Sequence, residues 1–202
     1  GEVFVATEDQ EIIEDVKQNG GQAILTSNKH KTGTDRIYEA IQKLGRSDID
    51  YIMNLQGDEP LMNIEDIKNL NNKMIQTKSK LGTLASSISD NKLFNNQNVV
   101  KVITKESLST SEFPEALDFM RKTLNVSKNI YHHLGIYCYQ LETLKNFVSY
   151  NQSSNEIKHK LEQLRALDNN IMINVALAKS SPIGVDTKED FVAIKKIMEY
   201  KT

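Results

Sequence analysis

The chain has a single cysteine, Cys138, among its 202 residues. One cysteine excludes an internal disulfide framework and a zinc site built on cysteine pairs, and it is in keeping with a reducing cytoplasm. No apolar run approaches the roughly 20 residues that a membrane-spanning helix needs, so membrane insertion is not expected. The sequence opens at Gly1 without a methionine or a signal peptide, and its third residue already lies in an apolar run, which is typical of the interior of a protein.

An excess of basic charge is also missing. Lys and Arg number 25 against 27 Asp and Glu, which gives a net charge of −2 and argues against a broad nucleic-acid binder. The sequence lacks the G-x-x-x-x-G-K-[ST] phosphate loop, the G-x-G-x-x-G dinucleotide fingerprint and the G-x-S-x-G nucleophile elbow. These absences exclude the P-loop, the dinucleotide-binding and the α/β-hydrolase patterns.

What is present is an ordinary globular composition, with 39% hydrophobic and 26% charged residues. The length predicts one domain, residues 1–202. Strand-like and helix-like patterns alternate along most of it, which predicts α/β layering with a mostly parallel sheet. Residues 105–130 are polar and poorly periodic, and we predict an irregular loop region there. The expected strands and helices, in chain order, are 3–6, a helix after 9, 23–25, 35–44, 51–55, a helix from 64, 81–88, 99–103, 134–139, 141–150, 156–167, 171–177 and a helix after 187 with Phe191, Ile194, Ile197 and Met198 inward.

In such folds the ligand binds beyond the carboxyl ends of the strands. The sharpest motif there is Gln56-Gly57-Asp58-Glu59-Pro60, directly after the strand 51–55. Gly57 permits close approach of a ligand to the backbone, and a carboxylate at this place suits a hard cation such as Mg²⁺. An acidic turn closed by Pro60 is the equally weighted alternative.

Two further motifs precede helices. Thr32-Gly33-Thr34-Asp35-Arg36 offers free N–H groups to an anion, and a plain N-cap at Thr34 is its alternative. Gly184-Val185-Asp186-Thr187 follows a strand and a small loop, and its alternative is a capping box with Glu189 or Asp190. On position alone the capping box is favoured, although a carboxylate from this segment and one from Asp58 would be able to share a metal.

Polar side chains stand out in two other segments. Alternation along Tyr131–Tyr139 places His133, Gly135, Tyr137 and Tyr139 on one face, where His and Tyr suit sugar hydroxyls, and an ordinary strand is the alternative. In Leu161-Glu162-Gln163-Leu164-Arg165 the polar residues lie off the apolar stripe, which by default is a solvated helix face.

Taken together, seven stretches resemble the 3-deoxy-manno-octulosonate (KDO) cytidylyltransferases, or CMP-KDO synthetases. No single stretch is specific to this family. The occurrence of all seven in the same order across nearly the whole chain is specific to it. The stretches are Val3–Asp9, Thr32–Ile37, Gln56–Pro60, Asn98–Val102, His133–Tyr137, Leu161–Leu167 and Gly184–Thr187.

The resemblance implies a Rossmann-like three-layer nucleotide-sugar transferase fold with a mostly parallel mixed sheet. It implies an enzyme that transfers CMP from CTP to the anomeric hydroxyl of KDO, an acidic eight-carbon sugar, releasing pyrophosphate for lipopolysaccharide biosynthesis. A cytoplasmic homodimer is expected with it, with neither a nucleic acid nor a membrane as partner.

The resemblance also assigns the site residue by residue. Asp58 and Asp186 match the catalytic, Mg²⁺-binding aspartates, and we expect them to lie close together. The nucleotide side comprises Thr32, Gly33, Thr34, Asp35, Arg36 and Gln56. The sugar side comprises Gln56, His133, Tyr137, Glu162 and Gln163.

Two departures from the family pattern bear on activity. The family begins earlier, with a strand and a triphosphate-binding loop that carries Gly, Arg and Lys, and this chain starts at what resembles the second strand. The family's Phe-Ser-Arg run is matched here to Thr110–Pro114, so that Glu112 replaces the Arg near the sugar, and His132 replaces a second basic residue. The alternatives are a cytidylyltransferase for a different acidic or amino-modified sugar, or an inactive fragment that keeps the fold and dimerises.

Overall fold

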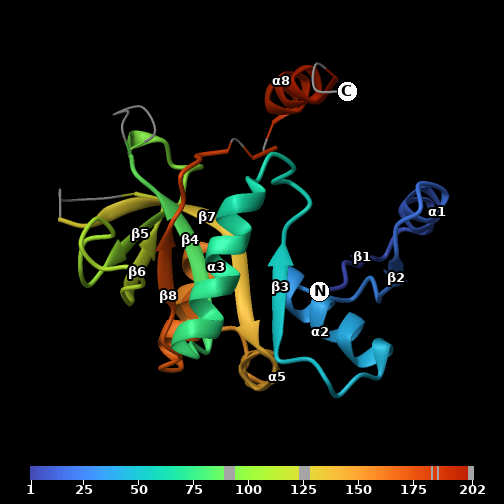
Figure 1. The fold of residues 1–202 in the computed structure, drawn as a ribbon, viewed down its shortest axis with the longest axis horizontal. Helices are drawn as coiled ribbons and strands as arrows, with labels where there is room; N and C mark the ends of the chain where they lie inside the picture. Colours follow the sequence, from blue (N-terminus) through green and yellow to red (C-terminus); the bar gives the residue numbers. More distant parts are fainter. Residues whose placement is uncertain (89–93, 123–127, 183, 186, 200–202) are drawn as a thin grey trace. The chain divides into compact units, whose positions relative to one another are not determined.

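The computed structural model describes residues 1–88, 94–122, 128–182, 184–185 and 187–199. The chain forms two compact units (Figure 1). The first unit comprises residues 1–52 and 141–151, and the second comprises residues 53–140 and 152–202.

The first unit contains a parallel pair of short strands, β1 and β2, in which Val5 lies opposite Ala23. Its helices begin at capped positions: the Asp9 carboxylate accepts a hydrogen bond from the Glu11 amide, and the turn after the first helix uses Gly20 at φ 78°. The elements of this unit are β1 (Val5–Thr7), α1 (Gln10–Gln18), β2 (Ala23–Leu25), α2 (Gly33–Leu44) and α5 (Leu141–Ser149).

The second unit is built on a sheet with the strand order β6-β5-β7-β4-β8, and β3 pairs with β7. Strands β4 and β8 are parallel, whereas β7 runs antiparallel to β4 and β5, and β6 runs antiparallel to β5. The strands are β3 (Tyr51–Leu55), β4 (Leu81–Ser86), β5 (Lys101–Thr104), β6 (Ala116–Met120), β7 (Ile130–Gln140) and β8 (Asn174–Leu177). The helices are α3 (Ile64–Thr77), α6 (Ser154–His159), α7 (Leu164–Asp168) and α8 (Lys188–Glu199).

The core of this unit lies around β4, all six residues of which are buried. Helix α3 packs on β4 and β8 through an apolar stripe that includes the fully buried Leu70 and Met74 (Figure 1). Gly82 permits this close packing, because a Cβ there would lie 2.5 Å from the Met74 sulfur. The α/β layering is therefore confirmed, while the described sheet is more mixed than the predicted parallel one.

In two predicted segments the kind or the continuity of the secondary structure differs from the prediction. The region 105–130, predicted to be irregular, contains strand β6, which pairs with β5. The helix predicted over 156–167 is interrupted: α6 ends at His159, its C-cap Lys160 has a left-handed backbone with φ 53°, and α7 begins at Leu164. Glu162 and Gln163 consequently lie in the connection between two short helices and not on a continuous helix face.

The apolar residues of α8 are also placed differently from the prediction. Of the four expected inward, only Ile194 is buried, while Phe191, Ile197 and Met198 are exposed. Helix α8 is capped as expected, since the Thr187 hydroxyl accepts from the Asp190 amide at 3.1 Å and the Asp190 carboxylate accepts from the Thr187 amide at 2.9 Å. Among the described residues, no helix combines the length and apolar character needed to cross a membrane.

A buried ion pair holds the connection between α6 and α7. Arg165 donates to both carboxylate oxygens of Glu156, at 2.9 and 2.6 Å, and both side chains are almost fully buried. Burial pushes the pKa of Glu156 upward, but the hydrogen bonds from Arg165 and Gln152 outweigh it, and the pKa lies below its usual value. Glu156 also completes a capping box with Ser153.

We expect Glu156→Gln to lower the free energy of unfolding by about 3–5 kcal/mol, because it leaves the Arg165 guanidinium buried without its counter-charge. Glu65→Gln is the matched control, since Glu65 also lies in a first helical turn and pairs with Lys68, but on the exposed surface. The control is expected to cost less than about 1 kcal/mol. Urea unfolding of both variants measures the difference, and equal losses would contradict a structural role for the buried pair.

Candidate active site

A face of strand β7 presents a histidine and two tyrosines in a row. The ring centroids of His133 and Tyr137 lie 5.4 Å apart and those of Tyr137 and Tyr139 lie 6.0 Å apart, as alternation predicts. Phe119 of β6 packs edge-on against His133, with centroids 5.1 Å apart. The sequence therefore placed these rings on one face correctly, and it did not anticipate Phe119 as their neighbour.

The turn after β3 is attached to β7 through a carboxylate. The Gly135 amide donates to Glu59 Oε1 at 2.9 Å, and the Glu59 amide donates to the Gln56 carbonyl at 3.1 Å within the turn. A Cβ at position 135 would lie 2.9 Å from Glu59 Oε1 and 3.8 Å from Gln56 Cδ, so a larger residue there would require the Glu59 carboxylate to shift. Gln56 and Glu59 thus lie against β7, and Glu59 was not among the predicted site residues.

Asp58, in the same turn, has an exposed side chain. Its carbonyl oxygen accepts a hydrogen bond from the Val185 amide at 2.8 Å, and a Cβ on Gly184 would lie 3.5 Å from the same oxygen. The segment that begins the Gly184–Thr187 motif therefore contacts the turn that carries Asp58. Asp186 lies outside the described residues, and its nearness to Asp58 stays a prediction.

A second carboxylate fixes the loop that leads to this segment. Asp66 of α3 is buried and accepts from the amides of Lys179 and Ser180 at 2.9 and 3.1 Å, and from the Ser180 hydroxyl at 2.5 Å. The hydroxyl oxygen of the next residue, Ser181, lies 3.1 Å from His132 Nδ1. Helix periodicity gives no hint of this role for Asp66, because its partners lie 113 and 114 positions further along the chain.

The ionisation states of the two central side chains follow from burial. Burial, with a contribution from His132, lowers the pKa of His133 to about 3, so the imidazole is neutral near pH 7. Burial raises the pKa of Tyr137 well above its usual value, and the charges of Glu162 and Glu59 act in the same direction. The phenol is therefore a hydrogen-bond donor, with two carboxylates in its surroundings.

Of the other predicted sugar-side residues, Gln163 is buried and directly follows Glu162 in the connection held by the Glu156–Arg165 pair. The structure thus brings His133, Tyr137, Gln56 and Glu162 into one region of the second unit. Gln56 lies close to Gly135, and the charge of Glu162 acts on the Tyr137 phenol.

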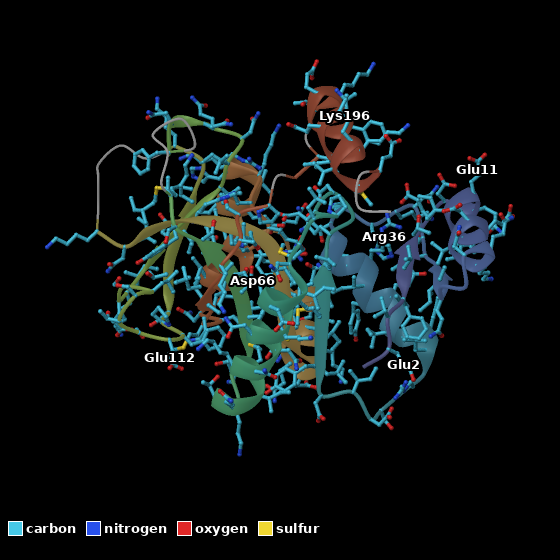
Figure 2. All side chains as sticks on the ribbon, turned by 45° about the horizontal axis from the view of Figure 1, so that its top comes forward. Glu2, Glu11, Arg36, Asp66, Glu112 and Lys196 are labelled. Carbon is cyan, nitrogen blue, oxygen red and sulfur yellow. The ribbon has the colours of Figure 1, made fainter. Side chains whose placement is uncertain are left out.

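Position 112, which the resemblance matched to the family's arginine, lies on the surface. Glu112 has a side chain that is 90% exposed and pairs with Lys73 of α3 at 3.1 Å (Figure 2). The run with the required Phe-x-Arg spacing is Phe119-Met120-Arg121, at the end of β6. It escaped notice because β6 was itself missed in the polar segment 105–130.

Arg121 directly follows β6, at the end of the antiparallel β5–β6 pair where β5 begins. Its guanidinium donates to the Asn98 carbonyl at 3.0 Å, and its own carbonyl accepts from the buried Lys101 ammonium at 3.0 Å. Lys101 also donates to the carbonyls of Asn96 and Val99, and burial lowers the pKa of its ammonium. This lysine therefore fixes the backbone from which Arg121 projects.

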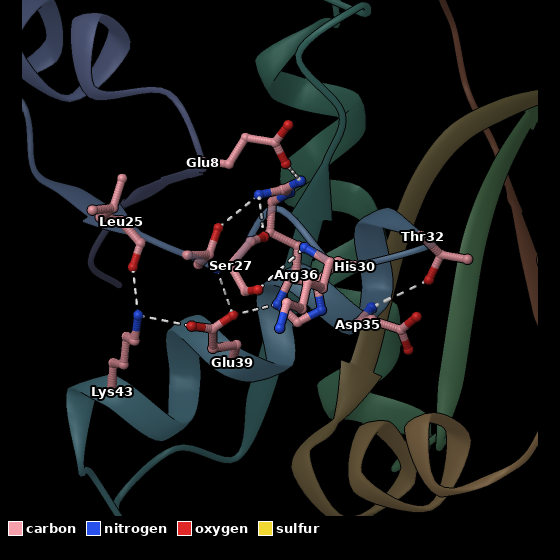
Figure 3. Close-up of polar contacts among 11 residues, drawn as sticks. Glu8, Leu25, Ser27, His30, Thr32, Asp35, Arg36, Glu39 and Lys43 are labelled. Carbon is pink, nitrogen blue, oxygen red and sulfur yellow. Dashed lines mark hydrogen bonds and ion pairs between the residues drawn. The ribbon is translucent and has the colours of Figure 1, made fainter.

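The predicted nucleotide segment lies in the first unit (Figure 3). Helix α2 begins at Gly33, two residues earlier than expected, and its N-cap is Thr32 and not Thr34: the Thr32 hydroxyl accepts from the Asp35 amide at 3.3 Å. Thr34 is buried in the first turn. The segment therefore is a helix N-terminus, as the anion-binding interpretation requires, with the cap moved by two residues.

Arg36 is engaged within this unit. Its guanidinium donates to the Thr26 hydroxyl at 2.7 Å and to the Ser27 carbonyl at 3.3 Å, and it pairs with Glu8. These contacts join α2 to the residues that follow both β1 and β2 (Figure 3).

Glu39, one turn further along α2, binds the same loop. Hydrogen bonds from Lys43, the Ser27 amide and His30 hold its pKa at about 2.

The comparisons with known proteins decide the family. The sequence pattern of cytidylyltransferases matches residues 1–176. The 3-deoxy-manno-octulosonate cytidylyltransferase of Thermodesulfovibrio yellowstonii is 42% identical over 98% of this chain and 81% of its own length. The chain belongs to the cytidylyltransferase family. The enzyme of the same name from Bartonella tribocorum is 38% identical, over 98% of this chain and 82% of its own length.

The fold of this cytidylyltransferase agrees with that membership. The solved structure of a CMP:2-keto-3-deoxy-manno-octonic acid synthetase complexed with CTP is 31% identical, with a TM-score of 0.86 over 100% of this chain and 82% of that one. A 4-diphosphocytidyl-2C-methyl-D-erythritol synthase from Anaerococcus prevotii is similar in fold alone, at 14% identity and a TM-score of 0.63, over 98% of this chain and 81% of that one. The nucleotide-sugar transferase fold implied by the resemblance is confirmed.

We expect Gly135→Ala to destabilise the cytidylyltransferase by about 1–3 kcal/mol, because the added methyl group displaces the Glu59 carboxylate from the β7 amide. Gly57→Ala is the control, since a Cβ there meets no atom within 4 Å. Its expected effect is below about 1 kcal/mol. Urea unfolding compares the two, and a Gly135→Ala variant as stable as Gly57→Ala would contradict the attachment of the turn through Glu59.

Proposed function

We propose that this protein is a CMP-KDO synthetase, an enzyme that transfers CMP from CTP to the anomeric hydroxyl of KDO. The observation that carries the proposal is the 42% identity over 98% of the chain to an enzyme of that name. The neighbouring structure, of the synthetase complexed with CTP, supports the same nucleotide. Its place in metabolism would then be lipopolysaccharide biosynthesis.

At the α-phosphorus, the reaction forms one bond and breaks one. The anomeric oxygen of the sugar attacks the α-phosphorus of CTP, the bond from that phosphorus to the bridging oxygen of pyrophosphate breaks, and the hydroxyl proton is released. Reactions of this kind depend on alignment of the two substrates and on neutralisation of the phosphate charge, with little covalent chemistry from the protein.

The sugar side of the site is made of hydrogen-bonding groups in defined states. Neutral His133 and the protonated Tyr137 phenol lie on one face of β7, and Gln56 lies against Gly135. Glu162 and Gln163 complete the set from the connection between α6 and α7. Hydrogen-bond donors and acceptors of this kind suit the hydroxyls of a polyhydroxylated sugar.

A cation is proposed for the carboxylate of that sugar. Arg121 takes the role that the sequence prediction gave to position 112, because a guanidinium binds a carboxylate with two parallel hydrogen bonds. The support is the Phe119–Arg121 run beside His133 and the bond from Lys101 that holds the Arg121 carbonyl. The argument for an amino-modified sugar rested on Glu112 and falls away with its exposed pairing to Lys73.

A nucleotide-binding role is proposed for Thr32–Arg36, within the first unit. The positive end of the helix dipole at the start of α2 favours a phosphate group. Arg36 contributes positive charge to the same turn, held in place by Thr26 and Glu8.

Mg²⁺ is the proposed cofactor, with Asp58 and Asp186 as its protein ligands. The fit rests on the donor chemistry: Asp58 offers an exposed carboxylate, and Val185, the residue before Asp186, is bonded to the Asp58 carbonyl. Within the described residues no group of three or more His, Cys, Asp or Glu forms a metal cage, and Mg²⁺ needs only one or two protein carboxylates. When bound, the ion neutralises charge on the triphosphate of CTP.

Two properties of the whole protein are proposed on family membership. The first is a homodimer. The second is a cytoplasmic location, which also agrees with a single cysteine, Cys138, that is free and buried.

Asp58→Asn is expected to reduce kcat by at least about 100-fold, because an amide oxygen carries no charge with which to hold the cation. Release of pyrophosphate from CTP and KDO, measured over a Mg²⁺ titration, gives the result. Glu65→Gln, on the exposed surface of α3, serves as the control and is expected to retain normal turnover. Wild-type turnover and wild-type Mg²⁺ dependence in Asp58→Asn would overturn the metal assignment. No turnover by a protein that also carries the family's triphosphate-binding loop would overturn the function.

Arg121→Met is expected to raise the KM for KDO by roughly 10–100-fold with little change in the KM for CTP, because it removes a charged hydrogen-bond partner of the sugar carboxylate. Glu112→Arg is expected to change neither constant by more than about twofold, since Glu112 pairs with Lys73 on the exposed surface. Steady-state kinetics of both variants test the correction. A large effect of Glu112→Arg and none of Arg121→Met would restore the original match.

A further inference from the structure

The pairing of β4 with β7 shifts register beside the candidate site. Thr83 lies opposite Tyr137, but the next residue, Leu84, lies opposite Leu134. The shift leaves Gly135 and Ile136 of β7 without partners in this ladder, as in a β-bulge. A bulge takes backbone groups out of the regular pairing, and those groups need other partners when they are buried.

The Thr83 hydroxyl lies inside this bulge, and Thr83 has no solvent exposure. Its oxygen lies 2.6 Å from the Ile136 carbonyl, 3.4 Å from the Leu134 carbonyl and 3.0 Å from His133 Nε2. A hydroxyl carries one proton, and a carbonyl oxygen can only accept. At 2.6 Å two oxygens need a proton between them, so the Thr83 proton goes to Ile136.

This assignment determines the proton on the histidine. With its own proton committed to the Ile136 carbonyl, the Thr83 oxygen is an acceptor toward His133, and Nε2 must carry the hydrogen. A neutral imidazole has only one N–H, so Nδ1 is left with a lone pair and no hydrogen. The Phe119 ring, at 86° to the imidazole, and the Tyr137 ring restrict its orientation.

We propose that Thr83 is a positioning residue that fixes His133 in the Nε2–H tautomer and so presents Nδ1 as a hydrogen-bond acceptor for a sugar hydroxyl. The inference rests on the proposed function and adds to it which group of the sugar His133 can bind. An acceptor binds a hydroxyl and cannot donate to a carboxylate, so the carboxylate of the sugar is left to a cation such as Arg121. Thr83 itself does not touch the substrate in this scheme.

The test uses three variants of the full protein. Thr83→Val keeps the shape of the side chain and removes the hydroxyl, while Thr83→Ser keeps the hydroxyl. Thr104→Val is the matched control: Thr104 is also buried, on β5, which pairs with β7 on the side away from β4, and its hydroxyl donates to the Glu106 carbonyl at 2.7 Å. The control therefore loses the same kind of bond without affecting His133.

The first readout is the ¹⁵N spectrum of the His133 imidazole. In the unchanged protein and in Thr83→Ser we expect a pyrrole-like Nε2 and a pyridine-like Nδ1, and the same in Thr104→Val. In Thr83→Val the two nitrogens are expected to move toward averaged values, because neither tautomer is then favoured. A pyridine-like Nε2 in the unchanged protein would overturn the proposal, whatever the enzyme's substrate.

The second readout is kinetic. Thr83→Val is expected to lower kcat/KM for the sugar by about 10-fold through a higher sugar KM, the effect of one hydrogen bond, with the KM for CTP unchanged. Thr83→Ser restores the value, and Thr104→Val stays within about twofold of the unchanged protein. Equal losses of kcat/KM in Thr83→Val and Thr104→Val would show that Thr83 has only a structural role. Absence of CMP-KDO formation by a protein that also carries the family's triphosphate-binding loop would refute the function and leave the tautomer result standing.

Discussion

The hydrogen bond from the Gly135 amide to the Glu59 carboxylate joins the two parts of the sugar side of the site. It attaches the turn 56–60 to β7, the strand that carries His133 and Tyr137. Because the carboxylate lies 2.9 Å from where a side chain would begin on residue 135, any residue larger than glycine at this point requires the carboxylate to move. The positions of Gln56 and Asp58 relative to the histidine and tyrosine depend on that one close approach.

Other carboxylates of the second unit also bind backbone amides or side chains of irregular segments. Asp66 binds two amides of the loop after β8, and Glu156 binds Arg165 and the Ser153 amide around the connection between α6 and α7. In each case a carboxylate holds an irregular segment that periodic secondary structure would leave without support. The acidic residues thus divide by exposure: Glu59, Asp66 and Glu156 organise loops, while Asp58 is exposed and available to a cation.

Buried polar side chains of the sheet also bind backbone groups around the site. Lys101 is fully buried, yet its ammonium donates to three backbone carbonyls and orders the chain on both sides of the β5–β6 hairpin. Thr83 satisfies a carbonyl in the β7 bulge and at the same time accepts from His133. Buried polar side chains must find partners, and here those partners lie next to the residues proposed for the sugar.

The sequence by itself determined the α/β alternation, the strands 23–25 and 51–55 to the residue, and the grouping of His133 with Tyr137, because hydrophobic periodicity and strand alternation are local properties. The seven ordered motifs were enough to find the family. Tertiary structure decided what local pattern cannot encode. Strand β6 is stabilised by pairing with β5 and not by its own apolar pattern, so Arg121 was missed and Glu112 was chosen instead. The break at Lys160 is stabilised by the buried Glu156–Arg165 pair, and Asp66 and Glu59 act on partners remote in the chain, since hydrogen bonds between distant residues leave no periodic trace in the sequence.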